Sequence, residues 1–154
     1  MVTGNDYPPN WVVLPNALLT VELVNRDWAR RPSIEICGNR EGFLAIGNIL
    51  LWLSDAPVEN EFFSITGLSF VHVPSALSFS IKQLCCGDRK QSTIHRIDKD
   101  VQYEWLVYDE LLQQHALGAI GIAFTPDGCC GDHYHVAVDD NSECEFIFIR
   151  NDIR

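Results

Sequence analysis

The chain has 154 residues, 47% of them hydrophobic, and a formal net charge of −10 at pH 7. That length suffices for one sizeable core and is short for two, so we expect a single domain over residues 1–154. A strongly negative field repels phosphate backbones, which argues against nucleic acid as a partner and favours another protein, with a basic surface. The same charge also keeps an ordinary cytoplasmic protein in solution, and this plainer interpretation stays open.

No apolar run approaches the roughly 20 residues that cross a bilayer, so we expect no membrane partner. The first ten residues have neither the basic start nor the apolar stretch of a secretion signal, and we expect a cytoplasmic location. The six cysteines are then expected to be reduced. Cys37 and Cys144 fall within apolar strands, where cysteine serves as a small hydrophobic residue.

In the first half, two β-rich segments, LLTVELV and SIEIC, predict a hairpin that turns through the basic loop NRDWARRP, residues 25–32. A helical run from Glu41 to Pro57 follows, because apolar residues recur there at helical spacing, and Asn39 is its expected cap. Two further β-rich segments, FFSIT at 62–66 and LSFSI at 77–81, predict a second strand pair.

The segment CCGDRK, residues 85–90, is the expected joint between the halves, because it combines glycine with charge and has no apolar periodicity. STIHRI and QYEWLV after it predict another hairpin. A second helical run extends from Glu110 to Pro126, with Asp109 as its expected cap. We expect His115 in this run to face solvent and the small residues of GAIGIA to let the helix approach a sheet closely. The strands HYHVAV and EFIFI complete this half.

Both halves thus show the order ββαββ. We expect an α+β fold of two similar ββαββ units, at about residues 17–83 and 91–150, with antiparallel sheets or one continuous sheet covered by the two helices. Residue identity between the halves is low. The alternative, that two ordinary α+β segments look alike by chance, therefore stays open.

The segment CCGDHYH, residues 129–135, is the densest group of metal-ligand residues. On a strand, His133 and His135 would share one face, as two imidazoles of a zinc site do, and Cys129 or Cys130 could add a thiolate. Against zinc, the second cysteine pair, residues 85 and 86, lacks the C-x-x-C spacing. We therefore expect no cofactor and keep a zinc-binding domain or metalloenzyme as the alternative. His135 with Asp139 could also form an acid–base couple, or both could simply face solvent.

Trp28 lies between Arg26 and the pair Arg30 and Arg31, a composition typical of an interface anchor, although it could instead fold back over a sheet edge. The last quarter of the chain is rich in acidic residues. We expect a protein partner to contact Trp28, Arg30, Arg31, Asp139 and Asp140. The sequence contains no G-x-S-x-G elbow, P-loop, G-x-G-x-x-G after a strand or H-E-x-x-H motif. No catalytic residue is assigned, and a non-enzymatic binding module is favoured over an enzyme.

The segment GNREGFLAIGNILLWLS, residues 38–54, stands between predicted strands. In this arrangement the chain resembles the small bacterial immunity proteins that neutralise polymorphic toxins, in families whose helix begins Gly-Asn-x-x-Gly-Leu. The matching start is Gly38, Asn39, Glu41, Gly42 and Phe43. The resemblance covers about a third of the chain. It implies a protein that blocks a toxin by contact, with no catalysis and no cofactor, and it does not imply a duplicated unit.

Overall fold

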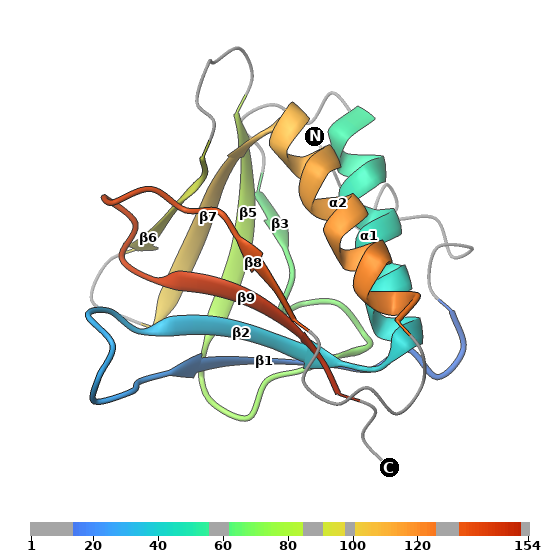
Figure 1. The fold of residues 1–154 in the computed structure, drawn as a ribbon, viewed down its shortest axis with the longest axis horizontal. Coiled ribbons are helices and arrows are strands. Elements are labelled where there is room, and N and C mark those ends of the chain that lie inside the picture. Colours follow the sequence, from blue (N-terminus) through green and yellow to red (C-terminus); the bar gives the residue numbers. More distant parts are fainter. Residues whose placement is uncertain (1–13, 56–61, 85–90, 98–100, 126–132, 152–154) are drawn as a thin grey trace.

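The computed structural model describes residues 14–55, 62–84, 91–97, 101–125 and 133–151. Within these ranges the fold is α+β, with two helices and two mixed sheets (Figure 1). In chain order the elements are β1 (Leu19–Val24), β2 (Ser33–Gly38), α1 (Arg40–Asp55), β3 (Phe62–Ser64), β4 (Val71–His72), β5 (Ser78–Leu84), β6 (Thr93–Ile97), β7 (Gln102–Tyr108), α2 (Asp109–Ala123), β8 (His133–Val136) and β9 (Glu145–Arg150).

The five-stranded sheet has the order β4-β1-β2-β9-β8, and the four-stranded sheet has the order β3-β5-β7-β6. The four strand pairs that the sequence predicts are confirmed as antiparallel: β1–β2, β3–β5, β6–β7 and β8–β9. The prediction of antiparallel sheets is wrong, because the central pairs β2–β9 and β5–β7 are parallel. Each of these pairs joins strands from different halves of the chain. They were not predicted because the pattern of a strand indicates a local hairpin but does not indicate a distant partner strand.

The two helices begin in different ways. Asn39 caps α1 as predicted, since its Oδ1 accepts a hydrogen bond from the Gly42 amide at 2.8 Å. The prediction that Asp109 caps α2 is wrong. Tyr108 occupies that position without a capping side chain, while Asp109 lies inside the first turn and accepts a hydrogen bond from Gln83 Nε2. Among the described residues, neither helix is long and apolar enough to cross a membrane.

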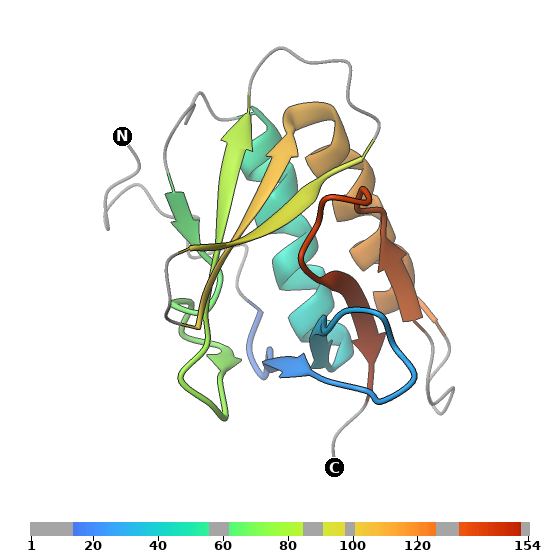
Figure 2. The ribbon, with the colours of Figure 1, turned by 90° about the vertical axis from the view of Figure 1, so that its left-hand side faces the viewer.

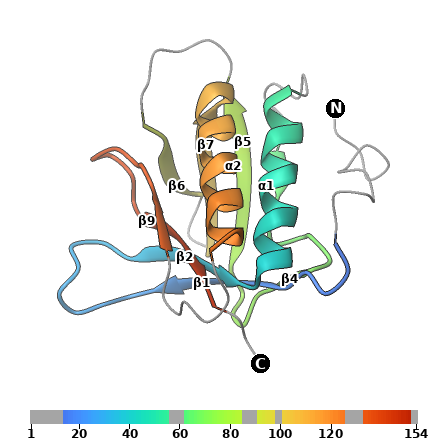
Figure 3. The same ribbon diagram turned by 45° about the vertical axis from the view of Figure 1, so that its right-hand side comes forward.

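The two helices pack closely against each other, and Figure 3 shows them side by side; α2 also packs against β8. A Cβ atom added to Gly47 of α1 would lie 2.6 Å from Ile120 Cγ1 of α2. A Cβ atom added to Gly118 would lie 2.5 Å from the ring of Tyr134 in β8. Both approaches are too short for any residue but glycine. The predicted close contact between the GAIGIA segment and a sheet is thereby confirmed.

One hydrophobic core includes buried residues of both halves. The sheets meet at Phe146 of β9, whose ring centroid lies 5.1 Å from that of Phe79 and 5.0 Å from that of Trp105. Phe148, two residues along β9, contacts Phe43 of α1 at 5.9 Å between ring centroids. The helices lie behind the four-stranded sheet in Figure 2, so this interior is enclosed by both sheets and both helices.

His115 does not face solvent, and that prediction is wrong. Its side chain is 1% exposed and packs against Trp105, with ring centroids 5.8 Å apart. Burial lowers the pKa of His115 to about 4. The physical reason is its position between Leu112 and Ala119, at spacings of three and four residues, which places it on the buried face of α2.

Candidate functional site

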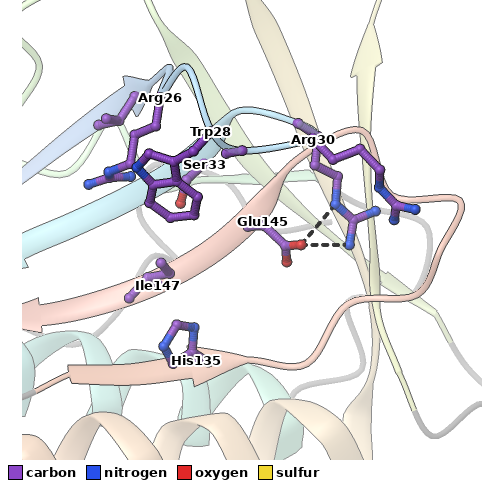
Figure 4. A pocket seen from close by; sticks show the side chains of 10 residues that line it. Arg26, Trp28, Arg30, Ser33, His135, Glu145 and Ile147 are labelled. Carbon is purple, nitrogen blue, oxygen red and sulfur yellow. Dashed lines mark hydrogen bonds and ion pairs between the residues drawn. The ribbon is translucent and has the colours of Figure 1, made fainter.

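A pocket of about 410 Å³ lies on the outer face of the five-stranded sheet, beside the connection between β1 and β2 (Figure 4). We call residues 25–32 the Trp28 loop. The loop residues that line the pocket are Arg26, Trp28, Ala29, Arg30 and Arg31, and the strand residues that line it are Val24, Ser33, His135, Glu145 and Ile147. We call this site the arginine pocket.

The strand register explains why these residues meet. Ser33 pairs with Val24 on one side and with Glu145 on the other, so it lies in the middle of a row across three strands. Ile147 pairs with His135 in the next row. Phe146 and Phe148 of β9 are buried in the core, and side chains alternate along a strand, so Glu145 and Ile147 point to the outer face.

The Trp28 loop is fixed at both ends by arginines. Near its start, Arg26 forms an ion pair with Glu35, and this hydrogen bond raises the pKa of Arg26 above its ordinary value. Near its end, Arg31 donates from Nε to Glu145 Oε1 at 3.0 Å, a pair marked by dashed lines in Figure 4. Arg31 Nη1 also donates to the main-chain oxygens of Asp139 and Ser142, at 3.1 and 2.6 Å. These contacts tie the loop to the body of the sheet.

Trp28 stands on this fixed loop with 84% of its surface exposed. The indole therefore does not fold back over a sheet edge. A large aromatic side chain held in solvent on an anchored loop has the arrangement of an interface hot spot, because its burial by a partner would remove a large apolar area from water.

The other predicted contact residues divide into two groups. Arg30 and Asp140 are exposed. Arg31 and Asp139 instead organise the loops: the carboxylate of Asp139 accepts hydrogen bonds from Thr93 Oγ1 at 2.5 Å and from the Asn141 amide at 3.1 Å. Among the described residues no hydrogen bond joins Asp139 to His135, so the predicted acid–base couple is not formed in this structure. That all five contact a partner stays a prediction.

His133 and His135 lie on one face of β8, as predicted, with ring centroids 4.9 Å apart. Cys129 and Cys130 lie outside the described residues. Within the part of the chain that the structure describes, no group of three or more His, Cys, Asp or Glu side chains is placed to hold a metal ion. A zinc site would therefore need ligands beyond these two imidazoles, since zinc takes three or four protein ligands.

Sequence reasoning missed Ser33, Glu145 and Ile147 as parts of the pocket. Ser33 is 5% exposed, and its Oγ has no hydrogen-bond partner among the described residues. A buried hydroxyl without a partner costs about 1–3 kcal/mol. A signal was present, because Ser33 directly follows the basic loop and opens β2, but the parallel pairing of β2 with β9 was not predictable.

Comparisons of the chain with protein-family models, with curated proteins and with solved structures found no match. The arginine pocket and the Trp28 loop are therefore the features of the molecule that bear on its function.

Proposed function

We propose that this protein is a non-enzymatic binding module that docks another protein on the Trp28 loop. The observation that carries the proposal is the 84% exposure of Trp28 on a loop fixed by Arg26 and Arg31. A loop that is already ordered loses little conformational entropy when it binds, so more of the energy of burying the indole appears as affinity.

The charge distribution supports a partner with a mainly basic surface. The chain carries a net charge of −10, which steers cationic proteins toward it, and the exposed Asp27 and Asp140 lie on the loops beside the pocket. Arg30, in contrast, is exposed and suits an acidic group at one point of the partner surface. Binding of this kind weakens as salt increases, because the steering is screened.

We further propose that the partner is a toxin and that the protein neutralises it by contact in the cytoplasm. Support comes from the helix start at Gly38, Asn39 and Gly42. Asn39 is used there as the cap of α1, and a Cβ atom on Gly42 would lie 2.6 Å from the main-chain oxygen of Leu18. The free thiols of Cys37 and Cys144 suit a reducing compartment.

We also propose that the halves are two interleaved ββαββ units. Exchanging β1 with β6, β2 with β7, β3 with β8 and β5 with β9 converts the order β1-β2-β9-β8 into β6-β7-β5-β3, which is the four-stranded sheet read backward. Every exchanged pair keeps its parallel or antiparallel sense. Among the described strands, β4 alone has no counterpart.

Co-purification from the native cells at low ionic strength tests the binding proposal. We expect the wild-type protein to retain a stoichiometric protein partner and Trp28→Ser to lose it, with an unchanged melting temperature. Phe124→Ser is the matched control, because Phe124 is a 71% exposed aromatic residue at the end of α2. The proposal is wrong if no stoichiometric partner is retained, or if Trp28→Ser retains it as well as the control does.

The toxin proposal has its own test. If a neighbouring reading frame encodes a toxin, co-expression with the wild-type protein should restore growth and co-expression with Trp28→Ser should not. Equal rescue by both proteins would exclude the Trp28 loop as the neutralising surface, and absence of rescue by the wild-type protein would exclude that toxin as the partner.

The second candidate function is binding of zinc, favoured by the adjacent rings of His133 and His135. Elemental analysis of protein purified without chelator should then show stoichiometric zinc. His135→Gln should lose the metal, whereas His95→Gln, at an exposed position of β6, should keep it. A metal-free preparation whose unfolding is the same with and without chelator would rule this candidate out.

A further inference from the structure

Ser33, one of the residues that line the arginine pocket, carries an unused hydrogen-bonding group. Ser33 is 95% buried, and its Oγ has no hydrogen-bond partner within the described part of the chain. In the strand register it lies between Val24 and Glu145, two other residues that line the pocket. A hydroxyl in this position is unfavourable in the empty protein and becomes favourable when a ligand atom completes its hydrogen bond.

The charges around Ser33 select the kind of ligand. Three arginines line the pocket, but Arg26 is paired with Glu35 and Arg31 with Glu145. Arg30 has no ion-pair partner among the described residues, so one positive charge is left uncompensated among the lining residues and their ion-pair partners. That charge matches a monoanion such as a carboxylate and leaves a phosphate dianion only half neutralised.

Apart from His135, the remaining lining residues are apolar. Trp28 contributes an indole, and Val24 and Ile147 contribute branched side chains; Figure 4 shows Trp28, Ser33 and Ile147 among the residues that line the pocket. The volume of about 410 Å³ suits a small organic molecule or one or two residues of a peptide. An aromatic body would stack on the indole while its charged group faces the donors.

We propose that the arginine pocket binds a monocarboxylate carried on an apolar, preferably aromatic, body. In the bound state Ser33 turns about χ1, so that its enclosed Oγ reaches the pocket and donates a hydrogen bond to one carboxylate oxygen. The arginines supply the positive field, and Trp28 covers the apolar body. This binding site shares Trp28 with the proposed protein-docking surface, and the two proposals are separated by their tests. Its test needs no partner protein, so it stands or falls independently of the proposed function.

Phenylacetate is a suitable probe, because it joins a benzene ring to one carboxylate. In an NMR titration of the full chain, we expect saturable shifts of the Trp28 indole N–H and the Ser33 amide. Phenylacetamide, the neutral isostere, should bind about tenfold more weakly, as should phenyl phosphate. Equal binding of phenylacetamide, or no shift by phenylacetate up to its solubility, overturns the proposal.

Two variants and one control assign the binding groups. Ser33→Ala should weaken phenylacetate binding about tenfold without lowering the melting temperature, because it removes an unpaired hydroxyl. Arg30→Gln should also weaken it, whereas Lys82→Gln removes the same charge from the other sheet and should leave it unchanged. Wild-type binding by Ser33→Ala, or a lower melting temperature of this variant, overturns the assignment, because the hydroxyl then has an internal role.

The carboxylate can belong to a free molecule or to the C-terminus of a peptide chain, and the same titration separates these sources. N-acetyl-leucyl-phenylalanine carries the carboxylate at the end of a peptide. If it binds more tightly than phenylacetate and its C-terminal amide does not bind, the ligand is a chain terminus. If phenylacetate binds more tightly, the ligand is a free carboxylate. If neither phenylacetate nor N-acetyl-leucyl-phenylalanine binds, the proposal is wrong.

Discussion

His115 Nδ1 and Tyr134 Oη share a hydrogen bond of 2.8 Å that joins α2 to β8. The same imidazole packs against Trp105, and its Nε2 has no hydrogen-bond partner among the described residues. Burial lowers the pKa of His115 to about 4, and it raises the pKa of Tyr134 above its ordinary value. Both groups are therefore neutral near pH 7, and a proton on His115 would be poorly accommodated.

The folding stability should consequently fall in mild acid. The unfolded chain protonates His115 near pH 6.5, whereas the folded chain does so only near pH 4, so protons favour the unfolded state between these values. From pH 7.5 to pH 5 this group should remove about 2 kcal/mol of unfolding free energy. Urea denaturation at both pH values measures the loss, which should level off below pH 4.

His115→Gln is the matched variant, since it keeps a polar side chain and removes the titration. Its unfolding free energy should change by about 2 kcal/mol less than that of the wild type over the same pH interval. His95→Gln, at an exposed position of β6, should behave as the wild type does. An identical pH dependence in His115→Gln and the wild type would show that His115 does not control acid stability.

Two glycines of α2 should respond in opposite directions to the same substitution. A Cβ atom on Gly118 would meet the Tyr134 ring at 2.5 Å, and moving this ring would disturb its hydrogen bond with His115. Gly121 has open space around it. We expect Gly118→Ala to lower the unfolding free energy by about 2 kcal/mol and Gly121→Ala to raise it by up to about 1 kcal/mol. Stabilisation by both substitutions, measured by urea denaturation, would contradict the close packing of α2 on β8.

The elements that were predicted correctly from the sequence are those whose determining contacts are local. The strand pair β6–β7 and the Asn39 cap depend on residues close in the chain, and their patterns indicated them correctly. Asp109 was misassigned because its partner, Gln83, is 26 positions away. His115 is a different case: its helical spacing from Leu112 indicated burial, but its polarity and its glutamine neighbours outweighed that signal.

The arginine pocket was only half predictable. The basic composition of the Trp28 loop indicated a binding surface, and the alternation of β8 indicated that His133 and His135 share a face. The parallel pair β2–β9 brings the Trp28 loop and β8 together. It places Arg31 beside Glu145, which is 114 positions away in the sequence. The choice of partner for a central strand depends on how the whole core packs, and no local pattern reports it.

Arg150 should be a major source of stability for the C-terminal end of α2. This buried arginine, 2% exposed, donates from Nη1 to the main-chain oxygens of Ala123 at 3.3 Å and Ile122 at 3.4 Å, and also to that of Thr125. Helix ends leave such oxygens without partners, and α2 has no basic residue in its own last turn.

Arg150→Met keeps the bulk of the side chain and removes these hydrogen bonds, so it should lower the unfolding free energy by about 3 kcal/mol. Arg40→Met is the graded comparison. Arg40 Nε donates to the Ala123 oxygen at 3.1 Å from a half-buried position, and its loss should cost about 1 kcal/mol. Thermal unfolding followed by circular dichroism measures both, and a smaller effect at Arg150 than at Arg40 would contradict this account of the helix end.

The two halves should fold only together. The central pair of each sheet, β2–β9 and β5–β7, joins one strand from each half, so either half alone would expose two open strand edges and half of the core. We expect fragments 1–87 and 88–154 to be unfolded separately, because neither can bury its apolar faces. Mixing them should restore the dispersed amide NMR spectrum of the intact chain, since the missing partners are then supplied in trans. A fragment that unfolds cooperatively by itself would show that the half is an independent unit, and the interleaved arrangement would then not govern folding.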